Sequence, residues 1–193
     1  VYDDTGGTMA VRLWWLLRWL GHERVAVLDG GWQAWTQAGL PLQETAAPEV
    51  ETVSFKGSAD WRQVVTSEAL EQQLRRGENR LQLIDARTRE RFRGDAEPID
   101  PVAGHIPGAI NLPLQDNLEN DGSFKTADTL RAMYVDAFAG QPPDSMVAMC
   151  GSGVTACHNL LAMEVAGLHG GRLYAGSWSE WIRDPGRPVA TGD

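Results

Sequence analysis

Residues 146–157, with the sequence MVAMCGSGVTAC, decide the fold class of this chain. A run of apolar residues at 146–149 is typical of a buried strand, and Cys150 follows it directly. The glycine-containing stretch after Cys150 predicts a tight loop, and residues 155–166 predict a helix. A strand, a loop and a helix in this order are typical of α/β folds, in which such a loop lies at the carboxyl edge of a parallel sheet.

Strands and helices alternate through the rest of the second half of the chain. Strands are expected at 64–65, 81–85, 109–112, 145–149 and 173–175, and helices at 67–76, 126–138 and 155–166. We therefore predict an α/β fold with a mostly parallel five-stranded sheet flanked by helices.

The two ends of the chain repeat each other at an offset of 146 residues. At this offset Asp4 aligns with Cys150 and Trp32 with Trp178, and several glycines also align. Both ends read as a short apolar strand, a glycine-rich loop, an apolar helix and a Gly-x-Trp-x-x-Trp motif. The first copy therefore has Asp4 in place of the cysteine.

The repeat predicts how the domains are arranged. Residues 1–40 are expected to be the C-terminal part of one domain, because nothing upstream of the first strand is present in that copy. Residues 41–59 show no helical periodicity and are expected to form a linker. Residues 60–193 are expected to form a whole domain that carries Cys150.

Composition and charge exclude several classes of function. The formal net charge of −9 and a pI near 4.9 disfavour nucleic acid or an anionic membrane surface as a partner. Small anionic substrates stay possible, since they need only local positive charge. No apolar run reaches the roughly 18 residues of a membrane span, so no membrane partner is expected.

The two cysteines, Cys150 and Cys157, are too few for a disulfide framework and suit a reducing compartment. No secretory signal pattern is present in a sequence that begins with Val1, and we expect a cytoplasmic location. Cys157 lies within the expected helix and is predicted to belong to the core.

Cys150 is placed for chemistry rather than for packing. Gly151 and Gly153 let the backbone curl around the sulfur with amide N–H groups pointing inward. The following helix directs its N-terminus at the same point. Both effects stabilise an anionic sulfur, which is the nucleophilic form of cysteine.

These residues carry a resemblance to a known family. The segment from Cys150 to Ala156 resembles the active-site loop of the rhodanese superfamily, in the version typical of 3-mercaptopyruvate sulfurtransferases. Residues 85–94 resemble its substrate-arginine segment, 104–109 its Gly-His-Ile-Pro-Gly-Ala turn, and 176–181 its Gly-x-Trp motif. The first copy is similar to the inactive N-terminal domain of tandem sulfurtransferases.

The resemblance implies a double-displacement reaction through a persulfide on Cys150, with no other cofactor. The donor would be a small anionic sulfur compound, with 3-mercaptopyruvate favoured over thiosulfate, and the acceptor cyanide, a thiol or a thioredoxin-like protein. Ser152 is the candidate for proton transfer beside Cys150. Substrate-binding residues of the loop would be Gly151, Gly153, Val154 and Thr155.

Arg91 is the substrate anchor that the resemblance implies, because a guanidinium offers a two-pronged donor to a carboxylate or sulfonate. Arg87 and Arg93 are expected to be solvated surface charges. Asp85 is a possible support for the loop or an arginine, and His105 a possible support that is more often structural in this motif. Mercaptopyruvate enzymes carry a second substrate arginine, but residues 97–100 contain none, and Asp100 stands in its place.

Three other functions can be compared with a mercaptopyruvate sulfurtransferase. A thiosulfate-specific rhodanese stays open, although loops of that type usually carry basic residues and residues 151–153 are uncharged. A non-catalytic sulfur-binding or docking module also stays open. A cysteine phosphatase is disfavoured, because Ala156 occupies the place of its phosphate-binding arginine. The histidines have no metal-ligand spacing, so no metal is expected.

Overall fold

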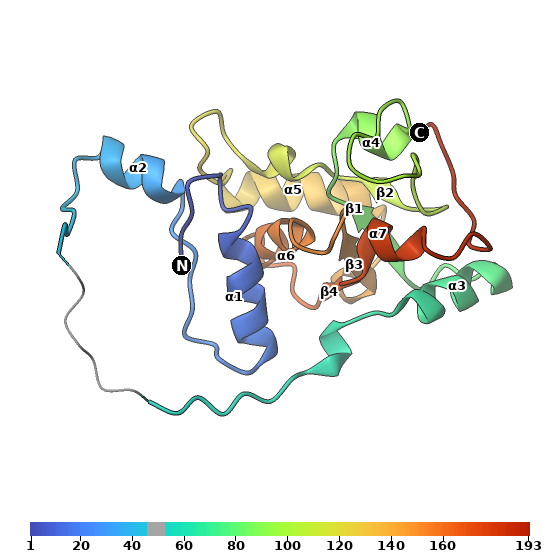
Figure 1. Cartoon of the computed structure of the whole chain (residues 1–193), viewed down its shortest axis with the longest axis horizontal. Coiled ribbons are helices and arrows are strands. Elements are labelled where there is room, and N and C mark those ends of the chain that lie inside the picture. Colours follow the sequence, from blue (N-terminus) through green and yellow to red (C-terminus); the bar gives the residue numbers. More distant parts are fainter. Residues whose placement is uncertain (46–52) are drawn as a thin grey trace.

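The computed structural model describes residues 1–45 and 53–193 (Figure 1). Its sheet is fully parallel, with the strand order β2-β1-β3-β4. The strands are β1 (Gln82–Asp85), β2 (Ile110–Asn111), β3 (Met146–Met149) and β4 (Arg172–Leu173). The α/β class and the parallel sheet predicted from the sequence are therefore confirmed.

The described residues form seven α-helices, together with three short 3-10 helices. The α-helices are α1 (Ala10–Trp19), α2 (Gly31–Gln37), α3 (Ser67–Arg76), α4 (Arg89–Arg93), α5 (Ala127–Phe138), α6 (Ala156–Val165) and α7 (Ser177–Trp181). The 3-10 helices are η1 (Trp61–Gln63), η2 (Leu114–Asn117) and η3 (Pro143–Ser145).

The prediction of five strands is wrong for the described residues, where the sheet has four. The expected first strand is reduced to a single parallel bridge between Val64 and Leu173. It is short because η1 ends at Gln63 and Thr66 already caps α3 by accepting a hydrogen bond from the N–H of Ala69. Too few residues lie between these helices to extend a ladder.

Strand β3 is buried on both faces, as parallel strands usually are. Met146 and Ala148 pack into a core with residues of α1, α5 and α6, whereas Val147 and Met149 pack into a second core with residues of α3 and α7. This two-residue alternation continues to Cys150, which packs on the α6 side. The nucleophile candidate therefore stands at the end of the most buried strand.

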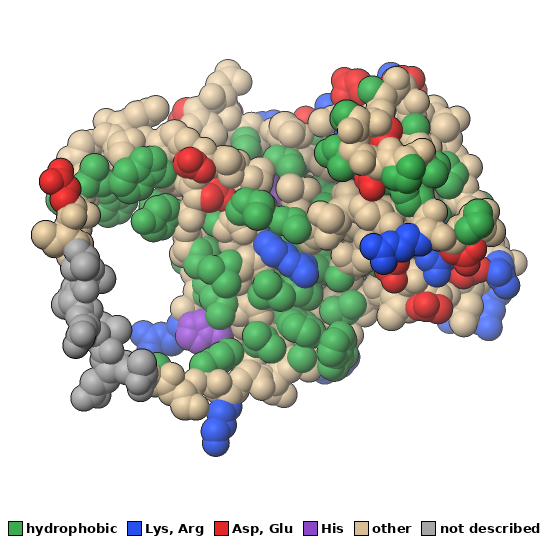
Figure 2. Space-filling model, viewed as in Figure 1, with side chains coloured by type: hydrophobic (Ala, Val, Ile, Leu, Met, Phe, Trp, Pro, Cys, Tyr) green, Lys and Arg blue, Asp and Glu red, His purple; other side chains and the backbone are tan. Residues whose placement is uncertain are grey.

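Helix α1, in the first segment of the chain, packs beside α6 (Figure 1). Hydrophobic side chains gather on this segment's outer face, over α1 and α2 (Figure 2). Met9 is 61% exposed and Trp32 is 40% exposed. The predicted linker at 41–59 lies partly outside the described residues, and no helix in the described ranges is both long and apolar enough to cross a bilayer.

Candidate active site

The Cys150 loop (residues 150–155) connects β3 to α6 at the carboxyl end of the sheet. Cys150 is 2% exposed, and its Sγ accepts a hydrogen bond from the N–H of Gly153 at 3.1 Å. Its own N–H donates to Ser177 Oγ at 3.1 Å, and its carbonyl accepts from the N–H of Trp178 at 3.0 Å. The loop thus contacts the sulfur of Cys150, and the start of α7 holds the backbone of the same residue.

Gly153 is fixed by sterics as well as by hydrogen bonds. Its φ of 75° lies in the left-handed region, and a Cβ at this position would stand 2.2 Å from the carbonyl oxygen of Ala175. Only a glycine fits this close approach, so the backbone N–H that faces Cys150 depends on the absence of a side chain.

Most amides of the Cys150 loop have no acceptor. Within the residues described, the N–H groups of Gly151, Ser152, Val154 and Thr155 donate no hydrogen bond. The Ser152 side chain is exposed at the loop surface, and Val154 and Thr155 are partly buried. Because the loop also leads into the N-terminus of α6, it offers several donors to an incoming anion.

Arg91 reaches the Cys150 loop from α4. A Cβ placed on Gly151 would lie 3.7 Å from both terminal nitrogens of Arg91 and 3.9 Å from Asp100 Oδ2. The Arg91 guanidinium pairs with Glu97 at 2.7 Å and with Asp100 at 3.1 Å. The predicted anchor therefore lies beside the loop, but two carboxylates share its charge.

The carboxylates of Asp100 and Glu97 are held by other groups as well as by Arg91. Asp100 Oδ1 lies 3.0 Å from the hydroxyl of Ser179, which is 2.7 Å from the carbonyl oxygen of Gly151. Burial acts to raise the pKa of Glu97, but Arg91 and nearby backbone N–H groups outweigh it and lower the pKa. Both carboxylates therefore neutralise Arg91 before any donor binds.

Arg87 corrects the expectation of a solvated surface charge. It is 4% exposed and pairs with Asp85 at 2.6 Å, and its guanidinium also donates to the carbonyl of Gly104 at 2.7 Å. The guanidinium lies over the ring of Trp178, 4.7 Å from its centroid. Asp85 therefore supports a buried arginine at the end of β1, one strand away from Cys150.

His105 and Arg93 lie away from the sulfur. His105 is buried, stacks on Phe92 with ring centroids 3.8 Å apart, and has Nδ1 2.8 Å from the Phe92 carbonyl oxygen. Its backbone pairs with Ala190. Arg93 pairs with Asp193 at the surface, where it was expected. His105 thus holds the 104–109 turn to α4 and to the C-terminal segment.

Residues 3–9 form a loop, the Asp3 loop, that corresponds to the Cys150 loop, and its geometry corrects the alignment made from sequence. The N–H of Trp32 donates to the carbonyl of Asp3, just as that of Trp178 donates to Cys150. Asp3, rather than Asp4, therefore occupies the place of Cys150. The Asp3 loop has seven residues before α1 begins, against six in the Cys150 loop, and an ungapped alignment misses this difference.

Asp3 fills its loop with its own charge. Its carboxylate accepts hydrogen bonds from the N–H groups of Thr5, Gly7, Met9 and Ala10, at distances between 2.8 and 2.9 Å. Burial acts to raise the pKa of Asp3, but these four amides outweigh it and lower the pKa. A loop of this kind therefore binds an anion within this same molecule.

Sequence reasoning missed three residues at this site: Arg12, Ser177 and Asp100 as a partner of Arg91. Ser177 has a positive φ of 55° and is fully buried. Its hydroxyl oxygen accepts a hydrogen bond from the N–H of Cys150. The repeat held a signal for it, because the residue aligned with Ser177 is Gly31, whose φ is also positive. No local pattern marks Arg12, since its contacts are with residues far along the chain.

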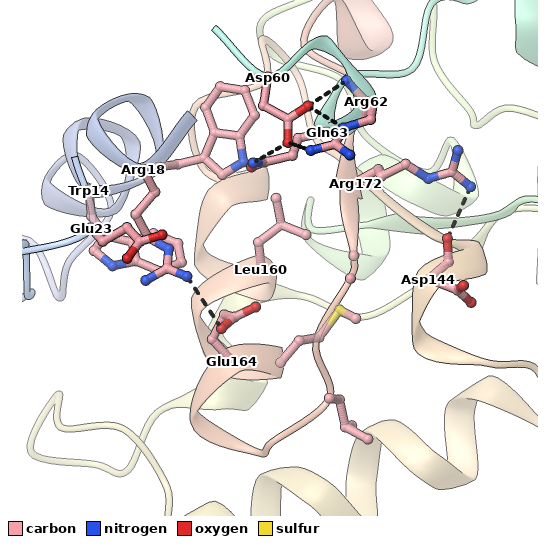
Figure 3. A pocket seen from close by; sticks show the side chains of 15 residues that line it. Trp14, Arg18, Glu23, Asp60, Arg62, Gln63, Asp144, Leu160, Glu164 and Arg172 are labelled. Carbon is pink, nitrogen blue, oxygen red and sulfur yellow. Dashed lines mark hydrogen bonds and ion pairs between the residues drawn. The ribbon is translucent and has the colours of Figure 1, made fainter. Parts of the chain in front are cut away.

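A groove of about 710 Å³ lies elsewhere, between α1, α6 and η1. Figure 3 shows Arg18 directed at Glu164 and Arg62 at Asp60, with distances of 3.8 and 2.7 Å. Four of its charged side chains thus form two ion pairs, and Cys150 does not line it. Across residues 1–45 and 53–193 no cluster of three or more His, Cys, Asp or Glu residues is placed to hold a metal ion.

Comparison with known proteins gives a consistent result. A family model described as the rhodanese-like domain matches residues 1–38 and 66–184. A protein of Pseudomonas aeruginosa named "Probable 3-mercaptopyruvate sulfurtransferase" is 51% identical over 194 residues, which cover 100% of this chain and 67% of that protein. The mouse thiosulfate sulfurtransferase is 38% identical over 187 residues, covering 94% of this chain and 61% of that protein.

The fold comparison agrees. The crystal structure of the Tum1 protein from Saccharomyces cerevisiae matches with a TM-score of 0.84 and 27% identity, covering 99% of this chain and 68% of that one. The chain spans about two thirds of the length of these relatives.

Proposed function

The chain belongs to the rhodanese-like family, and from this premise we propose that it is a sulfurtransferase that carries sulfur as a persulfide on Cys150. The observation that carries the proposal is the Cys150 loop, which turns one amide toward Sγ and leaves four others without an acceptor in the described structure. The Asp3 loop supports it, because a corresponding loop before a helix holds an anion there.

The proposed reaction has two displacements. The Cys150 thiolate attacks the sulfane sulfur of the donor, forming an S–S bond as the donor's bond to that sulfur breaks and its electron pair leaves with pyruvate or sulfite. An acceptor such as cyanide, a thiol or a thioredoxin-like protein then attacks the outer sulfur and regenerates the thiolate. The free amides of the loop stabilise the anionic sulfur in both states.

For the donor we propose 3-mercaptopyruvate ahead of thiosulfate. The uncharged residues 151–153 and the guanidinium of Arg91 suit one carboxylate rather than a more highly charged anion. The exposed hydroxyl of Ser152 is proposed to deliver the proton that the pyruvate carbanion needs. A thiosulfate-specific enzyme is the second candidate, which the identity to the mouse thiosulfate sulfurtransferase favours.

Residues 1–40 are proposed to be the C-terminal part of an inactive copy, and 60–193 the catalytic domain. Both cysteines are free thiols, which suits a reducing compartment, and we propose the cytoplasm. No resident cofactor or metal enters the proposed reaction.

Persulfide formation tests the proposal. The protein is incubated with 3-mercaptopyruvate or thiosulfate, freed of donor, and treated with cyanide to release thiocyanate. We expect one sulfur per chain in the wild type and in Cys157→Ser, and none in Cys150→Ser, because only Cys150 lies in the amide loop. Equal thiocyanate from Cys150→Ser and the wild type would end the catalytic interpretation and favour a docking module. The ratio of kcat/KM for the two donors decides between them.

A further inference from the structure

Arg12 connects the first copy to the Cys150 loop. It stands on α1, and its Nη1 donates to the carbonyl oxygen of Gly153 at 3.2 Å and lies 3.7 Å from Cys157 Sγ. The guanidinium is steadied by the ring of Trp15, 5.1 Å from its centroid. A side chain from the Asp3 copy therefore touches the residue whose N–H faces the Cys150 sulfur.

The contact fixes Gly153 on a third side. The Gly153 N–H points at Cys150 Sγ, its Cα lies against the carbonyl of Ala175, and its own carbonyl is held by Arg12. The thiol of Cys157 adds a weak hydrogen bond to this carbonyl at 3.6 Å. Without the guanidinium, the Gly153 peptide would keep only the weaker of its two carbonyl partners.

The charges around the loop single out Arg12. Arg91 is paired with Glu97 and Asp100, and the buried Arg87 is paired with Asp85. Arg12 forms no ion pair with any residue in the described ranges. Its positive charge is therefore the uncompensated one beside the Cys150 loop.

Cys157 does not compete for this charge. Burial is the main influence on this thiol and raises the pKa of Cys157 to about 11, against a smaller lowering by Arg12. Cys157 stays a neutral hydrogen-bond donor at physiological pH, so it does not neutralise the charge of Arg12.

We propose that Arg12 is a positioning residue for sulfur transfer: it holds the Gly153 carbonyl so that the Gly153 N–H faces Cys150 Sγ, and its charge favours the thiolate and the persulfide. The inference rests on the proposed function. It gives the first copy a direct part in the chemistry of the second, even though the first copy has no nucleophile of its own in this loop.

The experiment compares Arg12→Met, Arg12→Lys and the control Arg18→Met, which removes an arginine from the same helix without touching the loop. The readout is the thiolate absorbance of Cys150 against pH, taken as the difference from the same variant carrying Cys150→Ser. We expect the titration midpoint in Arg12→Met to move upward by about one pH unit, roughly a tenfold loss of thiolate near neutral pH. Arg12→Lys should retain most of the thiolate, and Arg18→Met should match the wild type.

Sulfur transfer gives a second readout. Arg12→Met should lower kcat about tenfold and leave KM for the donor within about twofold, because Arg12 contacts the loop and not the donor. A titration in Arg12→Met that superimposes on the wild type overturns the proposal, as does an equal shift in Arg18→Met. If no donor forms a persulfide but the Arg12→Met titration still moves, the proposed function fails and only the effect of Arg12 on the Cys150 thiolate stands.

Discussion

The Asp3 loop and the Cys150 loop have similar surroundings but differ in what their backbone amides contact. Both follow the end of an extended segment, precede an apolar helix and are bonded to a second helix through a tryptophan N–H. In the Asp3 loop, four backbone amides are taken by a carboxylate that is part of the chain. In the Cys150 loop, one amide meets the sulfur, and four others donate no hydrogen bond within the described residues. A permanent anion fills the Asp3 loop, whereas we propose that the nucleophile and the free amides make the Cys150 loop reactive.

The largest effect should come from giving the Cys150 loop a permanent anion. Cys150→Asp removes the nucleophile and offers the loop amides a carboxylate, so sulfur transfer should fall about a thousandfold or more. The thermal unfolding midpoint should stay near that of Cys150→Ser, because a carboxylate can accept the amides. Thiocyanate release and thermal unfolding, measured on both variants, check this. If Cys150→Asp unfolds far below Cys150→Ser, the two loops do not share an anion-binding geometry.

The next effect should come from closing the approach between Gly153 and Ala175. Gly153→Ala places a Cβ 2.2 Å from a carbonyl oxygen at a positive φ, and should lower the free energy of unfolding by about 3 kcal/mol. Gly77→Ala is the matched control, since Gly77 also has a positive φ but nothing lies within 4 Å of its Cβ position. It should cost about 1 kcal/mol in chemical denaturation. Equal losses would show that the close approach to Ala175 has no effect of its own.

A smaller effect is expected at the cation beside Gly151. If the Cys150 loop receives its anion from solution, Arg91→Ala should raise KM for the donor about tenfold. It should also lower the free energy of unfolding, because the buried carboxylates of Glu97 and Asp100 lose this partner. Arg89→Ala is the control, because Arg89 lies on the same helix and pairs with Asp116 at the surface. Steady-state kinetics with 3-mercaptopyruvate measure the difference. An unchanged KM in Arg91→Ala would remove this side chain from the donor site.

The smallest effect concerns the Asp3 loop and its dependence on pH. Because the folded-state pKa of Asp3 is lowered, its stabilisation is present above the unfolded pKa of about 3.9 and is lost as the pH falls through the folded-state value. Asp3→Asn should reduce the free energy of unfolding by about 1 kcal/mol at neutral pH and flatten its fall at acid pH. Asp4→Asn should change neither, and the reverse result would restore the ungapped alignment of the two copies.

Short-range patterns explain why the framework could be predicted and the partners could not. Neighbouring residues predict the strand before Cys150, the glycine loop and the helix after it. They also predict that Cys150 lies at the carboxyl end of the sheet. The burial of Arg87 depends on Trp178 and on the carbonyl of Gly104, which lie far from it in the sequence and approach it only on folding. The expected strand at 64–65 is reduced to one bridge because η1 ends just before it and α3 is capped just after it. Arg12 lies beside the Cys150 loop only because α1 packs on α6.

The extra residue of the Asp3 loop bears on how such a pair of copies can evolve. An aspartate-to-cysteine codon change alone would leave a thiol in a loop one residue too long, with N–H groups arranged for two carboxylate oxygens. Deletion of a codon alone would disturb the four amides that Asp3 uses. For the Asp3 loop to carry sulfur, it would therefore need a substitution and a deletion together, each unfavourable by itself. Under the two-copy interpretation, single sequence changes therefore do not easily convert the Asp3 loop into a second sulfur-carrying loop.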